Sequence, residues 1–179
     1  MATHKLSLAE FAASRAKLAR AFWPAVRRGL AAGGQRARAY LVERTQQLAF
    51  DRGGAARGWK VDARDKSVTI YNATPYFGVI EKGRRPGKRQ PPVAAIEPWV
   101  RRKVNVSYVP KSGKHKGQQR TRRARRDEAP AIAYLIARAI GRRGIKGKNV
   151  MGGALPKLKQ LLIEEVGHEI VRALEGLGG

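Results

Sequence analysis

Residues 67–83 read SVTIYNATPYFGVIEKG, and this stretch decides how the rest of the chain is interpreted. Its apolar residues Val68 and Ile70 alternate with polar neighbours, which is the period of a half-buried β-strand. Pro75 has no N–H group to give to a strand ladder, and its fixed φ angle suits the first turn of a helix. The stretch therefore predicts a strand followed by a short, largely buried helix that ends at Gly83.

Further elements are predicted on both sides of this stretch. The segment from Arg57 to Ala63 reads as a strand that forms an antiparallel hairpin with residues 67–72. The Pro91-Pro92 pair introduces a second helix. We expect the aromatic rings of these elements to be core residues rather than stacking platforms for bases, because each lies inside an apolar pattern; they are Trp59, Tyr76 and Trp99.

Long helices are predicted at the two ends of the chain. A capping box of Ser7 and Glu10 begins the first helix, Pro24 can kink it and Gly33-Gly34 can end it, so that one bent helix or two remain possible up to residue 50. Pro130 and Pro156 open two later helices with apolar stripes, and residues 141–153 read as a loop between them.

These elements predict an α+β fold, with a small, mainly antiparallel sheet packed against a long N-terminal helix and a C-terminal amphipathic helix. Residues 1–52 form the expected N-terminal helical segment, and residues 53–179 form the expected α+β core. A basic insertion interrupts this core at about residues 105–128.

Charge dominates the composition of the 179 residues. The formal net charge is +25, which destabilises a compact monomer by self-repulsion and indicates an anionic partner. Nucleic acid and an acidic protein surface both fit, whereas anionic lipid fits poorly because the charge does not gather on one apolar-backed helix. Cysteine is absent, which excludes disulfides and thiolate metal sites, and no apolar run approaches the length of a membrane span.

The predicted contacts with the anionic partner lie in basic loops. The insertion carries no acidic residue before Asp127 and has too few large apolar residues to order itself, so we expect it to be mobile until it meets its partner. The predicted contact residues are Arg84, Arg85, Lys88, Arg89, Lys111, Lys114, Lys116, Arg120, Arg122, Arg123, Arg125, Arg126, Arg142, Arg143 and Lys146.

Signals for catalysis are poor along the whole chain. His168-Glu169 begins like the helix motif of a zinc protease, but Arg172 stands where the second histidine belongs. No grouping of serine, histidine and aspartate can be proposed from the spacing. We therefore predict a protein that is not an enzyme and has no catalytic residue, metal site or cofactor.

The order of strand, short helix, basic loop, Pro-Pro and Trp-containing helix resembles the tail-completion, or head–tail joining, proteins of long-tailed bacteriophages. The resemblance extends from about Trp59 to Leu174. It is carried by Asn72, Pro75-Tyr76, Glu81, Gly83, Pro91-Pro92, Ile96, Trp99, Lys103, Tyr134, Ala137, Ile140 and the turn Arg143-Gly144-Ile145-Lys146.

The resemblance implies a structural virion protein of the phage neck. Its subunits would form a ring, hexameric as in that family, between the head connector or stopper proteins and the tail tube protein, with DNA passing through the lumen. It would be assembled in the host cytoplasm, and its charge would face acidic neighbouring rings or anchor DNA that halts there. The resemblance gives structural or interface roles to Asn72, Tyr76, Glu81, Gly83, Trp99 and Gly144.

A second interpretation rests on Gly141-Arg142-Arg143-Gly144, which is similar to the Gly-x-x-Gly loop of KH-type RNA-binding domains. In KH domains the second glycine leads directly into a helix, whereas several more glycines follow here. A KH-like or other basic nucleic-acid-binding protein is therefore the alternative to the neck protein.

Overall fold

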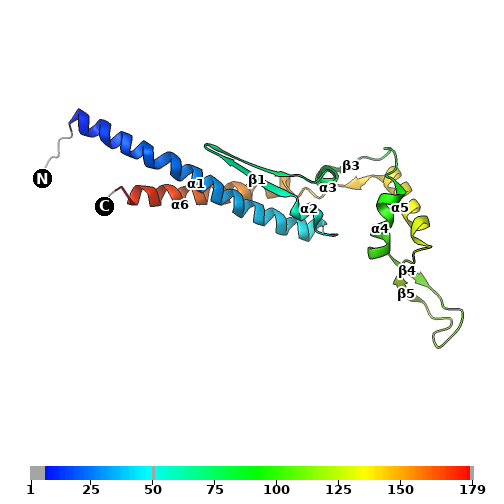
Figure 1. The fold of residues 1–179 in the computed structure, drawn as a ribbon. Coiled ribbons are helices and arrows are strands. Elements are labelled where there is room, and N and C mark those ends of the chain that lie inside the picture. Colours follow the sequence, from blue (N-terminus) through cyan, green and yellow to red (C-terminus); the bar gives the residue numbers. More distant parts are fainter. Residues whose placement is uncertain (1–6, 50, 178–179) are drawn as a thin grey trace. The chain divides into compact units, whose positions relative to one another are not determined.

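The computed structural model describes residues 7–49 and 51–177, without the side chain of Glu10 (Figure 1). The predicted α+β class is confirmed, with a long N-terminal helix, a C-terminal helix and antiparallel strands. In chain order the elements are α1 (Leu8–Ala49), α2 (Gly54–Arg57), β1 (Trp59–Arg64), β2 (Ser67–Asn72), α3 (Phe77–Lys82), β3 (Gly83–Arg84), α4 (Val93–Lys103), β4 (Asn105–Tyr108), β5 (Arg120–Arg123), α5 (Ala129–Arg143), β6 (Ile145–Lys146), the 3-10 helix η1 (Gly152–Ala154) and α6 (Leu155–Glu175).

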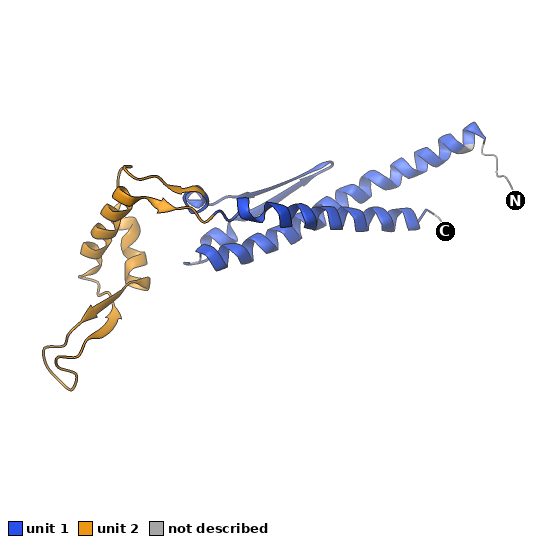
Figure 2. Cartoon of the chain, turned by 180° about the vertical axis from the view of Figure 1, so that it is seen from behind, with its two compact units in different colours: residues 1–81, 149–179 blue, residues 82–148 orange. Residues whose placement is uncertain are grey.

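The chain forms two compact units whose boundaries differ from the predicted break at residue 52. Unit 1 comprises residues 1–81 and 149–179, and unit 2 comprises residues 82–148 (Figure 2). Helix α6 packs along α1, so the first and the last helix of the chain belong to unit 1 (Figures 1 and 2). Unit 2, which contains the basic insertion, is inserted between them in the sequence.

Helix α1 is continuous, and Gly33-Gly34 does not end it as the sequence suggested. A Cβ atom on Gly33 would lie 3.0 Å from the Cα atom of Leu162 in α6, and one on Gly34 would lie 2.8 Å from Val61 Cγ1 in β1. These glycines therefore allow α6 and the hairpin to approach the helix backbone closely. Pro24 also lies inside α1. The predicted capping box falls outside the described part of the structure because it depends on the Glu10 side chain, and residue 50 falls outside it as well.

The core of unit 1 surrounds Trp59, which is 1% exposed as predicted. The Trp59 indole Nε1 donates a hydrogen bond of 2.8 Å to Thr45 Oγ1, and the Thr45 hydroxyl donates one of 2.6 Å to the Leu41 carbonyl. The Phe77 ring meets Trp59 edge to face, with centroids 4.8 Å apart. The buried members of this cluster are Ala37, Leu41, Trp59, Val150, Ala154 and Leu158.

The predicted hairpin of β1 and β2 is confirmed, with Trp59 opposite Asn72 and Arg64 opposite Ser67. The described strands do not form one sheet, however. They make three separate two-stranded antiparallel ladders, which are β1–β2, β3–β6 and β4–β5.

Helix α3 is short and has no fully buried residue, so the prediction of a largely buried helix is wrong. Only Phe77 and Ile80 pack against the Trp59 cluster, because a helix of six residues presents a single narrow face. The Tyr76 side chain is 52% exposed and that of Trp99 is 40% exposed, so their prediction as core residues is also wrong.

Unit 2 has a smaller core between α4 and α5. Ala129, Ala133 and Ala137 recur at every fourth position of α5 and are buried, so small side chains let the helix lie close to its neighbours. Val100 of α4 is the largest fully buried side chain here. Both helices begin near the predicted prolines, and the segment 141–153, predicted as a loop, contains the end of α5, β6 and part of η1.

The basic insertion is ordered at both ends, contrary to the expectation of an unstructured loop. Strands β4 and β5 pair in register, from Asn105 opposite Arg123 to Tyr108 opposite Arg120. We call this two-stranded β4–β5 ladder, with the loop that joins its strands, the ribbon. Its base is held in place because Val106 packs against the core of unit 2 and the Ala124 N–H donates to the Val104 carbonyl at 3.1 Å.

Candidate anion-binding surface

Positive charge is concentrated in unit 2. Its 67 residues include 21 lysines and arginines but three acidic residues, a formal net charge of +18. Unit 1 has 17 basic and 10 acidic residues in a longer stretch of sequence. Within unit 2, Glu97 is paired with Arg101 and Glu128 with Arg122, so these two acids neutralise local arginines. Most of the basic side chains of unit 2 therefore have no carboxylate to offset them.

A first group of basic residues, the ladder cluster, gathers around β3 and β6. Strand β3 pairs with β6, and the Gly87 N–H donates to the Gly141 carbonyl at 2.9 Å. These contacts hold the loop after β3 against the end of α5. They bring together residues that are far apart in the sequence, namely Arg84, Arg85, Lys88, Arg89, Arg142, Arg143 and Lys146.

Two glycines make this ladder possible. Gly83 has a φ angle of +78°, and a Cβ atom there would lie 2.2 Å from the Ile145 carbonyl oxygen. Gly144 has a φ angle of +74°, and its Cβ atom would lie 2.2 Å from the Arg84 carbonyl oxygen. Both positions therefore require glycine for conformation and for space.

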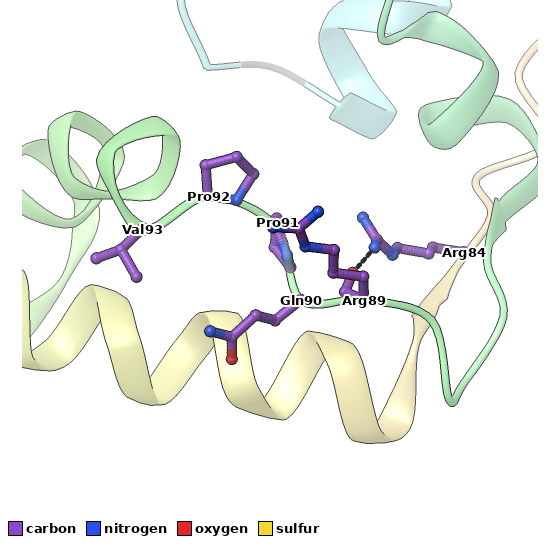
Figure 3. Close-up of a pocket in the computed structure, with 6 residues that line it drawn as sticks. All are labelled: Arg84, Arg89, Gln90, Pro91, Pro92 and Val93. Atoms are coloured by element: carbon purple, nitrogen blue, oxygen red, sulfur yellow. Dashed lines mark hydrogen bonds between the residues drawn. The ribbon is translucent and has the colours of Figure 1, made fainter.

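A pocket of about 460 Å³ opens beside the ladder cluster (Figure 3). Arg84 and Arg89 lie on one side of it, and the Arg84 guanidinium donates a hydrogen bond to the Arg89 carbonyl. The remaining lining residues are Gln90, Pro91, Pro92 and Val93. No carboxylate lines this pocket, so its polar groups suit an anion better than a cation.

The second group of basic residues, the ribbon cluster, lies on and beside the β4–β5 ladder. Its members are the other predicted contact residues, Lys111, Lys114, Lys116, Arg120, Arg122, Arg123, Arg125 and Arg126. Arg122 differs from the rest because it is used inside the chain. Its guanidinium donates to Glu128 Oε1 at 2.5 Å and to Oε2 at 2.8 Å, and it lies 5.0 Å from the centre of the Tyr108 ring.

Glu128 is the electrostatic anchor of the ribbon. Its carboxylate accepts hydrogen bonds from the Arg122 side chain and from the Arg125 N–H at 2.9 Å. The Arg122 hydrogen bond, supported by that of Arg125, lowers the pKa of Glu128 to about 2. The hydrogen bond with Glu128 in turn raises the pKa of Arg122. Sequence reasoning missed this role, although Asp127 and Glu128 are the first acidic residues after a run of arginines.

The phage-like motif residues Asn72 and Glu81 have structural partners. The Asn72 side chain donates to the Ala55 carbonyl at 2.7 Å and accepts from the Thr74 N–H at 3.0 Å, which fixes the turn after β2. The Glu81 carboxylate accepts from the N–H groups of Met151 and Gly152, each at 2.9 Å. Glu81 therefore takes backbone partners at the start of η1.

The two aromatic motif residues, Tyr76 and Trp99, belong to neither basic cluster. The Tyr76 hydroxyl lies against Gly54, where a Cβ atom would be 2.6 Å from it. Trp99 is exposed on α4. The Gly-x-x-Gly segment also departs from the KH arrangement, because Gly141 lies inside α5 and Gly144 leads into strand β6 rather than a helix.

The described residues contain no group of three histidine, cysteine, aspartate or glutamate side chains that could hold a metal ion. Among the same residues, no helix combines the length and the apolar character needed to cross a membrane. Comparison of the chain with protein families, curated proteins and solved structures finds no match.

Proposed function

We propose that this chain is a structural subunit of the neck of a long-tailed bacteriophage. Copies of it form a closed ring, with six subunits as the expected number, that joins the head connector to the tail tube. Tail completion of this kind needs shape and charge complementarity rather than catalysis. DNA passes through the lumen of the ring, and the protein acts in the virion.

The observation that carries the proposal is the convergence of two distant motif segments. Glu81 and Gly83 come from the strand–helix segment, and Gly144 comes from the Arg-Gly-Ile-Lys turn about 60 residues later. Gly83 and Gly144 permit the β3–β6 ladder, while Glu81 holds the start of η1 just beyond that turn. Three residues that carry the resemblance to the neck proteins, Glu81, Gly83 and Gly144, therefore stabilise or permit the same local structure, namely the β3–β6 ladder and the adjoining start of η1.

Exposed apolar side chains on unit 1 supply surfaces for contacts between subunits. Their exposure is unusual for such large residues on α1 and α6, and an oligomer would bury them. They are Leu8, Phe11, Leu18, Trp23, Ile163, Val171 and Leu174. The free edges of the two-stranded ladders offer further sites for pairing between chains.

The positive charge of unit 2 suits the anionic neighbours expected in a neck. Acidic faces of adjacent rings and the phosphates of DNA are both compatible with a net charge of +18. The ladder cluster and the ribbon cluster are the surfaces that would meet them.

The test is the mass of the purified full chain in solution, alone and with the products of neighbouring genes. A closed ring predicts a single species with a mass of several chains that also binds a connector or tube protein. A strictly monomeric chain that joins no such complex and is absent from virion necks would refute the proposal.

A further inference from the structure

We propose that the β4–β5 ribbon is an arm that contacts double-stranded DNA, lying along a groove with its basic side chains on the phosphates. This inference goes beyond the neck proposal, because it rests on the chemistry of the ribbon and names its partner. It also selects DNA over an acidic protein surface, which the charge of the chain alone leaves open.

The shape of the ribbon suits a groove of DNA. Strands β4 and β5 form four consecutive residue pairs, and the ribbon extends from the α4–α5 helix pair to a loop at its far end (Figures 1 and 2). The major groove of B-DNA is wide enough to admit a two-stranded ribbon of this kind. An isolated two-stranded ribbon is only marginally stable in water, so this one adds little to the stability of the fold. Contact with a partner gives a reason for its presence.

The base of the ribbon is fixed by one arginine, which leaves the others for a partner. Arg122 is held by Glu128 and stacks beside Tyr108, on the face that also carries Val106. The opposite face carries four exposed residues with hydrogen-bonding side chains, namely Asn105, Ser107, Thr121 and Arg123. Such side chains commonly contact DNA phosphates.

The far end of the ribbon adds charge without any acid. Residues 98–126 contain no aspartate or glutamate. Within the described part of the chain, no ion pair involves the exposed basic residues Lys111, Lys114, Lys116, Arg120 and Arg123. Gly113 and Gly117, with φ angles of +84° and +79°, form the turns that carry these lysines. The loop therefore presents several cations over a short length of backbone.

The scarcity of exposed apolar and aromatic side chains on the ribbon favours duplex DNA over other anionic partners. Single strands are bound by stacking on large aromatic rings, but the only phenylalanine, tyrosine or tryptophan of the segment 105–126 is Tyr108, which Arg122 engages. Protein interfaces are centred on apolar or aromatic side chains, and the ribbon offers only Val109, which is 54% exposed. Binding to the phosphates of a duplex requires neither aromatic stacking nor an apolar centre, so duplex DNA is the partner that suits the ribbon best.

The test compares two variants of the full chain with the same loss of charge. The arm variant carries Lys111→Gln, Lys114→Gln, Lys116→Gln and Arg120→Gln. The control variant carries Lys60→Gln, Lys157→Gln, Lys159→Gln and Arg20→Gln, at exposed positions of unit 1. Fluorescence anisotropy measures binding to a short labelled duplex, to one of its strands and to poly-glutamate as salt is raised, and thermal unfolding checks that both variants fold.

At about 0.1 M salt the arm variant should lose at least about tenfold in duplex affinity, and its salt slope should fall by about 3. The control variant should lose about threefold or less, because its lost charges are outside the ribbon and act on the DNA only through screened long-range attraction. Equal losses by the two variants, an unchanged arm variant, or a loss confined to the single strand or to poly-glutamate would overturn the proposal. The mass of the arm variant separates the two proposals, since a ring that no longer binds DNA leaves the neck proposal standing.

Discussion

The two units of this chain use charged residues in opposite ways. In unit 1, basic residues are paired across the α1–α6 seam, where Arg28 binds Glu169 at 2.8 Å and Arg36 binds Glu165 at 2.5 Å. In unit 2, an excess of basic residues surrounds a small core lined by alanine. On this comparison we propose that unit 1 supplies stability and surfaces for assembly, whereas unit 2 supplies an electrostatic contact surface.

The hydrophobic cores differ in the same direction. Unit 1 buries Trp59 completely and satisfies its indole N–H, and Phe77 packs on the ring. Unit 2 leaves its only tryptophan, Trp99, 40% exposed. The free energy of unfolding should therefore be far more sensitive to truncation of a core side chain in unit 1 than in unit 2.

The largest expected effect is that of Trp59→Ala. Removing this buried ring should lower the free energy of unfolding by about 3–5 kcal/mol, because it leaves a cavity and removes the indole N–H that donates to the Thr45 hydroxyl. Trp99→Ala is the matched control and should cost about 1 kcal/mol or less. Denaturant unfolding followed by circular dichroism measures both, and equal costs would remove the distinction between the two cores.

The next effect concerns the ladder that shapes unit 2. Gly83→Ala should destabilise this ladder by about 2–3 kcal/mol, because the new Cβ atom combines a strained φ angle with a clash on the Ile145 carbonyl. Gly87→Ala is a control with a similar φ of +76° but nothing within 4 Å, and it should cost about 1 kcal/mol. Amide hydrogen exchange at β3 and β6 measures the difference, and similar values for the two variants would show that space is unimportant there.

A smaller effect is expected at Glu81. Glu81→Gln replaces a carboxylate that accepts two backbone N–H groups by an amide with a single acceptor oxygen, which should cost about 1–2 kcal/mol. Glu43→Gln is the control, because Glu43 is exposed and accepts a hydrogen bond from the Gln47 side chain, and the loss of stability should be near zero. Thermal unfolding of both variants measures the costs, and a neutral Glu81→Gln would show that this carboxylate does not stabilise η1.

The smallest effect is a dependence of the ribbon on pH. The pKa of Glu128 is lowered from 4.5 to about 2 by its hydrogen bond with Arg122. Its contribution to stability is therefore complete above pH 4.5 and is lost as the pH falls toward 2. The NMR signals of Tyr108 should report the base of the ribbon loosening over this range, and Glu128→Gln should show the loosened state already at neutral pH. A ribbon unaffected by either change would contradict the anchoring role of Glu128.

Sequence patterns predicted the elements whose signals are local. The alternation in Ser67–Asn72 gave the β2 strand, and the prolines at positions 130 and 156 marked the starts of α5 and α6 correctly. The same local signals misjudged Gly33-Gly34, because a glycine that ends a helix and one that admits a neighbouring backbone look alike in sequence. Only the position of α6 and the hairpin distinguishes them.

The basic surface was predictable in composition but not in organisation. Every residue of the ladder cluster and the ribbon cluster was identified from the charge runs, whereas their grouping depends on the β3–β6 pairing across about 60 residues. The internal use of Arg122 was missed because its partner Glu128 lies in the next element of the chain. Exposure of Tyr76 and Trp99 was missed because an apolar pattern does not state whether a neighbouring element covers it.

The most direct test of the division between the units is hydrogen–deuterium exchange of the full chain with and without a short DNA duplex. We expect slower exchange at residues 84–89, 105–126 and 142–146, and unchanged exchange along α1 and α6 of unit 1. Protection of α1 and α6 by the duplex, with no change in the ribbon or the ladder cluster, would contradict the assignment of the contact surface to unit 2.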